Sequence, residues 1–331
     1  MNTETAERRI EKKLYSGIDI LKLVCAVLVV FLHTYCYDFG IVGGVLKFIT
    51  NIGVPFFFIA SGYFYEKGLS RAENKRQYFC RYFKRIFFMY CIWTALSLPA
   101  FIYNLVTTKG YGVPMLCLYV IRAFFLTGSM GVYWYLLSLL YVSFILYYVR
   151  IHPKLELPLY IVAVIMFIFG LVYNEGLLVN NMFGILTHVV FSSERNFLMV
   201  GLFYMCMGWL ISAKNPRLPS MPILLIALSC SIGLMVADFF WIPLSVSPAP
   251  AALCLFLVGL KWDCRISPKS SYRIRSLSTG IYLTHFPFII LFDLYLEKGT
   301  YIDLPLTLLV CLVVYSLAQL LPENVRKLVF G

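Results

Sequence analysis

The feature that most constrains this chain is a series of apolar runs, most of them near the ~20 residues that a helix needs to cross a bilayer. Only 13% of the 331 residues are charged and 61% are hydrophobic, whereas a soluble domain carries about 25% charged residues. A water-soluble core cannot enclose so much apolar surface, so we predict an all-α integral membrane protein with about ten transmembrane helices. The predicted spans are 18–38, 44–65, 82–106, 131–149, 157–174, 194–213, 220–239, 247–260, 276–296 and 303–321. Two further apolar stretches, 114–127 and 178–191, are expected to lie in the membrane interface or to re-enter the membrane.

The distribution of basic residues predicts which side of the membrane each loop faces. If the N-terminus is cytoplasmic, five of the 28 lysine and arginine residues fall in outer loops and Lys22 falls inside the first span, which leaves 22 on the cytoplasmic side. Cytoplasmic loops are enriched in lysine and arginine, so we expect both termini in the cytoplasm and an even number of spans. We expect a cytoplasmic N-terminal segment (1–16), one transmembrane domain (17–322) and a cytoplasmic tail (323–331).

The sequence shows no motif of a soluble metalloenzyme or nucleotide-binding enzyme. It has no CxxC pair, zinc-ligand spacing, glycine-rich phosphate loop or nucleophile elbow, and its ten cysteines lie mostly in apolar runs, so no metal is expected. The net charge of +12 could suggest a nucleic-acid partner, but cytoplasmic loops explain it more simply. We therefore expect a multi-pass protein of the cell (inner or cytoplasmic) membrane, with the lipid bilayer as partner and without a nucleic-acid partner. The sequence does not indicate the oligomeric state.

The first predicted span contains three ionisable residues, Asp19, Lys22 and His33. Eleven residues separate Lys22 from His33, which places both side chains within about 20° of each other on one helix face and roughly 16 Å apart along its axis. Charge is costly in hydrocarbon, so such residues are candidates for function. A deep imidazole can act as a general base or relay protons, and Lys22, steadied by Asp19, can pair with a phosphate or carboxylate. The alternative is that Asp19 and Lys22 snorkel to the interface and His33 only packs.

Aromatic and hydroxyl side chains in later spans are candidates for substrate binding. Ser61, next to Gly62 in the second span, can hydrogen-bond a ligand or lie in a close helix–helix contact. Trp134 and Tyr135 suit either a platform on which a sugar stacks or an aromatic belt at the membrane interface, and the belt is the commoner case.

Charged and titratable side chains near the other spans are further candidates. Arg195 can contact an anionic acceptor or form an interfacial salt bridge with Glu194. His285 is either a ligand-facing residue or a buried, hydrogen-bonded histidine. Arg81 and Arg85 belong to a basic segment that can receive phosphate groups, although the bias of cytoplasmic loops towards basic residues also explains it.

Six short segments, taken in order, resemble the acyltransferase family 3 pattern of membrane acyltransferases. They are Asp19-Ile-Leu-Lys22 with His33, Gly53-Val-Pro-Phe-Phe-Phe-Ile-Ala-Ser-Gly-Tyr63, Arg81-Tyr-Phe-Lys-Arg85, Tyr133-Trp-Tyr-Leu136, Glu194-Arg-Asn-Phe-Leu198 and Gly280-Ile-Tyr-Leu-Thr-His285. Their order and spacing cover nearly all of the chain from residue 17 to 320. The resemblance differs from the family pattern at two places: Lys22 stands where arginine is frequent, and Val132 stands where a histidine often precedes the tryptophan.

The resemblance implies transfer of an acyl group, usually acetyl from cytoplasmic acetyl-CoA or another acyl-CoA, to a hydroxyl or amine of a sugar, glycolipid or other envelope acceptor. It implies that Lys22 and His33 are the central pair, with His33 taking the proton of the acceptor. Lysine is a point charge that lacks the two-pronged geometry of arginine, so a planar contact to a carboxylate or phosphate would be lost at Lys22. The chain is also similar to the membrane domains of vancomycin-resistance-type serine racemases, which implies, as the alternative, transport of a small substrate such as L-serine.

Overall fold

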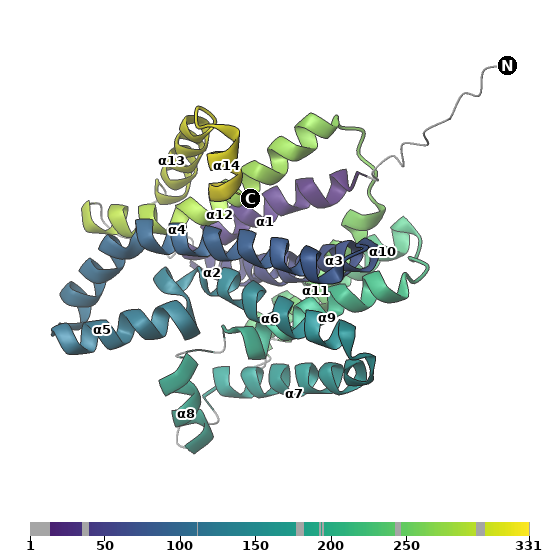
Figure 1. Cartoon of the computed structure of the whole chain (residues 1–331), viewed down its shortest axis with the longest axis horizontal. Coiled ribbons are helices and arrows are strands. Elements are labelled where there is room, and N and C mark those ends of the chain that lie inside the picture. Colours follow the sequence, from purple (N-terminus) through teal and green to yellow (C-terminus); the bar gives the residue numbers. More distant parts are fainter. Residues whose placement is uncertain are drawn as a thin grey trace.

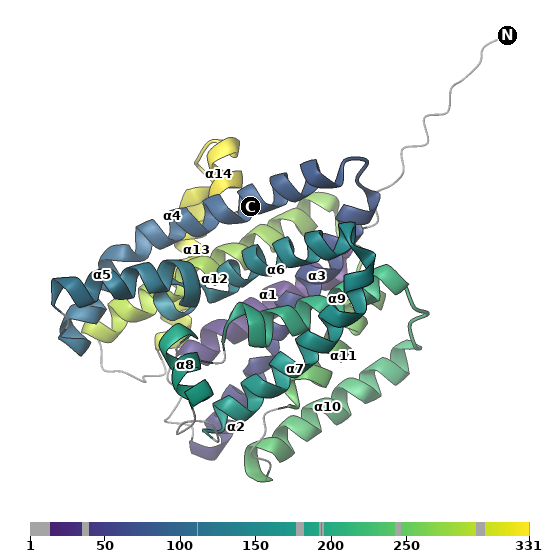
Figure 2. The same ribbon diagram turned by 60° about the horizontal axis from the view of Figure 1, so that its bottom comes forward.

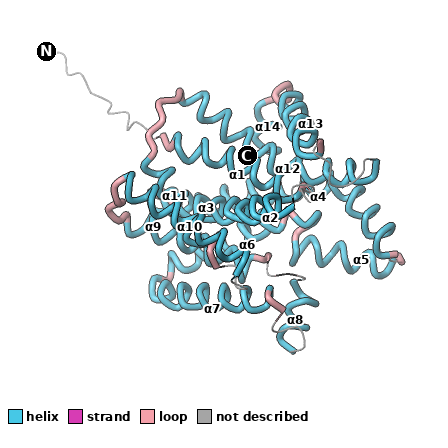
Figure 3. Tube along the Cα trace, turned by 180° about the vertical axis from the view of Figure 1, so that it is seen from behind, coloured by secondary structure: helices cyan, strands magenta, loops and turns pink. Residues whose placement is uncertain are grey.

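The computed structural model describes residues 14–34, 40–110, 112–176, 182–191, 193, 195–241, 246–295 and 302–330. Helices connected by short loops make up these ranges, and no strand occurs in them (Figures 1 and 3). The α-helices are α1 (Ser16–His33), α2 (Gly40–Ile49), α3 (Gly53–Arg71), α4 (Lys75–Lys109), α5 (Val113–Arg122), α6 (Trp134–Ile151), α7 (Glu156–Asn174), α8 (Met182–Phe191), α9 (Leu202–Lys214), α10 (Met221–Trp241), α11 (Pro248–Lys261), α12 (Pro268–Tyr295), α13 (Asp303–Ala318) and α14 (Glu323–Phe330).

Each predicted span overlaps at least one helix, but not all of these helices meet the requirements of a membrane span. In the described part of the chain, seven segments are long and apolar enough to cross a bilayer. They are Ser16–His33, Gly40–Arg71, Lys75–Thr107, Trp134–Ile151, Pro153–Asn174, Phe197–Lys214 and Met221–Phe240. The apolar helices at Val113–Thr127, Pro248–Lys261 and Asp303–Ala318 are shorter. The all-helical membrane fold is therefore confirmed, whereas ten spans and cytoplasmic termini stay predictions.

The helix boundaries differ from the predicted ones where the backbone changes direction. The first span was expected to reach residue 38, but α1 ends at His33, because Thr34 is already extended (φ −81°, ψ 138°). Residues 35–38 of that prediction lie outside the described residues. The second span, expected as one run over 44–65, is α2 and α3 joined by a 3₁₀ turn at Thr50–Ile52.

Two helices at the margin of the bundle show why the fold needs a membrane. α7 lies along one edge in Figures 1 and 3, and α10 along an edge in Figure 2. On α7, five large apolar side chains are 45–67% exposed: Leu157, Ile161, Val164, Ile165 and Ile168. Polar residues would cover such a surface in water, so these side chains are expected to face lipid.

α3 and α9 pack closely against each other, and two glycines make that approach possible. A Cβ atom on Gly62 would lie 2.1 Å from the carbonyl oxygen of Met205, and one on Gly208 would lie 1.9 Å from that of Ile59. Small residues let membrane helices approach closely enough for backbone packing. α3 is thereby fixed next to α1 and α11, with its opposite face available to line a cavity.

In the segment 323–331, predicted as a cytoplasmic tail, the described residues 323–330 form α14, which packs against the bundle. Phe330 is buried, 5.9 Å from the Trp93 ring of α4 between centroids, and the Trp93 indole donates a 2.8 Å hydrogen bond to the Val329 carbonyl. Phe330 also lines the cavity described next, so this segment belongs to the packed structure.

Candidate functional site

One cavity of about 280 Å³ is lined by three basic residues from three helices: Lys22 of α1, Arg85 of α4 and Arg275 of α12. We call it the basic cavity. The Lys22 ammonium lies 5.2 Å from the centre of the Phe64 ring, a distance at which a ring face attracts a cation. Arg81, predicted to act beside Arg85, is exposed and does not line the cavity. The three lining cations give the cavity the charge needed to hold an anionic ligand.

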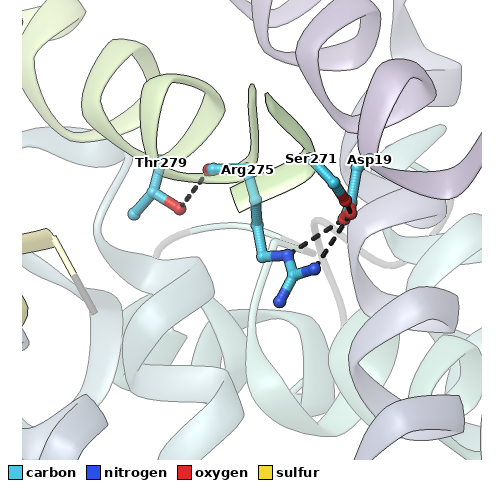
Figure 4. A network of polar contacts seen from close by, with 4 residues as sticks. All are labelled: Asp19, Ser271, Arg275 and Thr279. Carbon is cyan, nitrogen blue, oxygen red and sulfur yellow. Dashed lines mark hydrogen bonds and ion pairs between the residues drawn. The ribbon is translucent and has the colours of Figure 1, made fainter. Parts of the chain in front are cut away.

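Asp19 pairs with Arg275, not with Lys22 as predicted. The Arg275 guanidinium donates to both carboxylate oxygens, from Nε at 3.0 Å and from Nη2 at 2.9 Å, and the Ser271 hydroxyl donates to the same carboxylate (Figure 4). The Asp19 side chain is 4% exposed, so these partners offset the cost of burying its charge. The pair joins α1 to α12, and Nη1 of Arg275 does not contact the carboxylate.

Ser61 and Tyr135 meet at the basic cavity. Their hydroxyl oxygens are 2.9 Å apart, and both residues line the cavity. Both interpretations of the Ser61-Gly62 pair therefore apply, one to each residue. Gly62 lies in the close helix–helix contact with α9, and Ser61 faces the cavity. Tyr135 also packs edge-on against Tyr282 of α12, with ring centroids 5.3 Å apart, and Phe57 lies 6.1–6.2 Å from both rings. These three aromatic rings form a layer at the side of the basic cavity where α3, α6 and α12 meet.

A second cavity, of about 210 Å³, contains His33, Trp134 and Arg195. We call it the histidine cavity. Trp134 is only 8% exposed, so a lipid-facing aromatic belt, the commoner interpretation of this residue, is wrong here. Trp134 presents an aromatic surface to the same space as the imidazole of His33 and the arginine. Glu194, the alternative partner of Arg195, lies outside the described residues.

His285 lies next to His33 in the interior of the bundle. The two imidazole centroids are 5.5 Å apart with planes inclined by 32°. His285 is fully buried, and its Nδ1 lies 2.7 Å from the Tyr282 carbonyl oxygen and 3.1 Å from that of Ile281. Its Nε2 has no hydrogen-bond partner among the residues that the structure describes. A buried, hydrogen-bonded histidine was one of the two predicted alternatives, and the contact with His33 brings it to the candidate site as well.

The two cavities are neighbours on α6, because Trp134 lines the histidine cavity and Tyr135 the basic one. Lys22, in the first half of α1, and His33, its last residue, likewise line one cavity each. Sequence analysis missed Arg275 and Tyr282. Arg275 is one of several basic residues before the ninth predicted span, and only its contact with Asp19, 256 residues away, distinguishes it from the others.

Comparisons with known proteins show which family and which relatives the chain is similar to. The model of a family described as "Acyltransferase domain" matches residues 15–321. A serine/alanine racemase of Enterococcus gallinarum is 24% identical over 254 residues, which are 73% of this chain and 35% of that protein. An amino-acid racemase of Enterococcus faecalis is 27% identical over 163 residues, 47% of this chain and 21% of that protein. The matched region thus spans about a third or less of these relatives, and no solved structure matches the chain.

Proposed function

Because the chain belongs to the acyltransferase family that this match defines, we propose that it transfers an acyl group, in the first instance acetyl, from acyl-CoA to an envelope acceptor. The acceptor would be a hydroxyl or amine of a sugar, glycolipid or related molecule. The observation that supports the proposal is that α1 places its two candidate residues in different cavities. Lys22 lies in a cavity lined by cations, and His33 lies in a separate cavity beside Trp134.

The basic cavity suits the donor. The phosphate groups of CoA are anionic, and Lys22, Arg85 and Arg275 offer three cations at one opening. Arginine binds phosphate through two parallel N–H groups, and lysine adds a point charge. With the N-terminus in the cytoplasm, as predicted, this cavity would open to the cytoplasm, where acyl-CoA is present.

The histidine cavity suits the acceptor. Trp134 offers a flat apolar face for a sugar ring, and Arg195 offers a cation for an acidic substituent. The acyl end of the donor would have to reach His33 past the layer of Phe57, Tyr135 and Tyr282, which lines the basic cavity. These rings would have to change rotamer to let a thioester through.

In the proposed reaction, His33 accepts the proton of the acceptor hydroxyl while the hydroxyl oxygen attacks the thioester carbonyl carbon. A carbon–oxygen bond forms, the carbon–sulfur bond breaks, and the proton passes from His33 to the departing thiolate. The products are the acyl ester and free CoA. General base catalysis of this kind contributes about 10²–10⁴-fold in rate.

Purified protein in detergent or nanodiscs, mixed with acetyl-CoA and a panel of envelope glycans and glycolipids, would test this proposal. Release of free CoA is followed with a thiol reagent, and the acetylated acceptor is identified by mass spectrometry. We expect acceptor-dependent release by the wild type and loss of release in His33→Gln. Equal release by both proteins would exclude His33 as the base.

The second candidate function is transport of a small amino acid, which the two racemase relatives support only weakly, through the amino acids in their names. In that case Lys22 would hold the substrate carboxylate and His33 would relay protons. Proteoliposomes loaded with buffer and supplied with labelled L-serine separate the two functions. Saturable uptake without release of CoA with any acceptor would support the transporter.

A further inference from the structure

His285 has a hydrogen-bonding arrangement that fixes the positions of its protons. A carbonyl oxygen can only accept a hydrogen bond, so the short contact from Nδ1 to the Tyr282 carbonyl oxygen requires a proton on Nδ1. In the neutral ring Nε2 is then a bare acceptor. The charged ring would bury a second N–H group without an acceptor, which is costlier. His285 is therefore a neutral imidazole whose Nε2 needs a donor.

Among the described rings that contact His285, one can supply that donor. The Tyr282 hydroxyl is already used, because it donates to the Val132 carbonyl, and the Phe286 ring has no polar hydrogen. His33 is the remaining ring neighbour, at 5.5 Å between centroids. Two imidazoles that share an N–H···N bond have centroids about 5 Å apart, one donor–acceptor distance of about 3 Å plus the two ring radii. A small rotation of His33 would close this contact.

The backbone around His285 is held more firmly than a proline-containing helix usually is. Pro287 has no N–H group, so the Leu283 carbonyl loses its partner in the helix. The Tyr133 hydroxyl donates to that carbonyl at 3.0 Å and also lies 2.9 Å from the Ser97 hydroxyl. Together with the bond from Tyr282 to Val132, this fixes α12 against the start of α6 and so fixes the direction of the His285 ring.

We propose that His285 is a positioning residue for His33. Its Nε2 accepts the N–H of one His33 nitrogen, which leaves the other His33 nitrogen unprotonated and directed to the acceptor. When His33 takes the acceptor proton it becomes an imidazolium, and its hydrogen bond to His285 becomes charge-assisted and stronger. His285 itself neither gains nor loses a proton. This inference rests on the proposed function in that it takes His33 to be the general base.

A spectroscopic test is independent of activity. The chain has four histidines, His33, His152, His188 and His285, so ¹⁵N-histidine labelling gives a spectrum that single substitutions can assign. We expect the signal lost in His285→Gln to report a neutral ring protonated on Nδ1, and its Nε2 resonance to move in His33→Gln. A His285 ring protonated on Nε2, or an Nε2 resonance unaffected by His33→Gln, would overturn the proposal.

A kinetic test separates positioning from packing. His285→Phe keeps a ring but has no acceptor, whereas Gln carries an amide oxygen that can replace Nε2. We expect His285→Phe to lower kcat about 10–100-fold, as loss of an orienting partner commonly does, with an unchanged KM for acetyl-CoA. His285→Gln should recover part of kcat, and the matched control His152→Gln, in the loop after α6, should behave as wild type. Equal losses of kcat in His285→Phe and His285→Gln would overturn the proposal. If the wild type released no CoA, the proposed function would be refuted. The histidine spectrum would still decide whether His285 positions His33.

Discussion

The basic cavity and the histidine cavity share α1, α3 and α6, but α4 and α12 complete the basic cavity whereas α7 and α9 line the histidine cavity. In the basic cavity the cations lie near water: the Arg275 side chain is 53% exposed although its partner Asp19 is buried. In the histidine cavity the imidazole of His33 lies against the rings of His285 and Phe286, with centroids 5.5 and 5.1 Å away. Exposed cations suit the binding of an anion that arrives from water, whereas an imidazole held against other rings suits proton transfer. This difference is the basis on which we propose that the donor binds in one cavity and that the chemistry takes place in the other.

The largest effect is expected in the histidine cavity. His33→Gln should lower kcat about 10²–10⁴-fold, because the general base is removed, and should leave binding of CoA unchanged, because the basic cavity is intact. Turnover is measured by release of free CoA, and binding by isothermal titration with CoA. A variant that loses affinity for CoA together with turnover would show that the two cavities do not divide the work as proposed.

The next effect belongs to the basic cavity. Lys22→Gln removes a charge-assisted contact worth about 1.5–3 kcal/mol and should raise the KM for acetyl-CoA about 10–100-fold. Lys22→Arg keeps the charge and is the matched control, with a KM expected near the wild-type value. If Lys22→Gln lowered kcat and left KM unchanged, Lys22 would belong to the chemistry and not to donor binding.

A smaller effect tests whether Asp19 serves the cavity through Arg275. Asp19→Asn keeps the volume but weakens the two-point contact, so Arg275 becomes less well placed and the KM for acetyl-CoA should rise about 10-fold or less. The control is Glu323→Gln, which breaks the exposed Glu323–Lys327 pair on α14 and should change neither KM nor kcat. If Asp19→Asn had a wild-type KM and an unchanged melting temperature, the ion pair would join α1 to α12 without contributing to donor binding.

The smallest effects come from the two neighbours on α6. Tyr135→Phe loses the hydroxyl that bonds Ser61, worth about 0.5–1.5 kcal/mol, and should raise the KM for the donor about 2–10-fold. Trp134→Phe shrinks the aromatic face of the other cavity and should raise the KM for the acceptor only. Initial rates with each substrate varied in turn measure both constants. If the KM for the donor and the KM for the acceptor changed together in either variant, the two cavities would not bind the two substrates separately.

The sequence predicts the parts of this account that depend on local pattern. Helical periodicity alone places Lys22 and His33 on one face of α1, and the apolar runs place most of the helices. The rest depends on tertiary contacts. Asp19 could not be assigned to Arg275 because 256 residues separate them, and spacing within α1 made Lys22 the natural partner. Likewise, composition cannot show that Trp134 is buried, because an interfacial belt and a cavity wall favour the same residue type.

The central claim is that donor and acceptor enter from different cavities, and the most direct test is the sidedness of the reaction. Membrane vesicles of both orientations are prepared in a cysteine-free background, with Glu73→Cys labelling used to establish which side the loop after α3 faces. Acetyl-CoA, which does not cross the bilayer, is added outside. The account predicts release of CoA only from inside-out vesicles, in which the basic cavity faces the medium, with the acetylated acceptor inside. Equal release from right-side-out vesicles would contradict it.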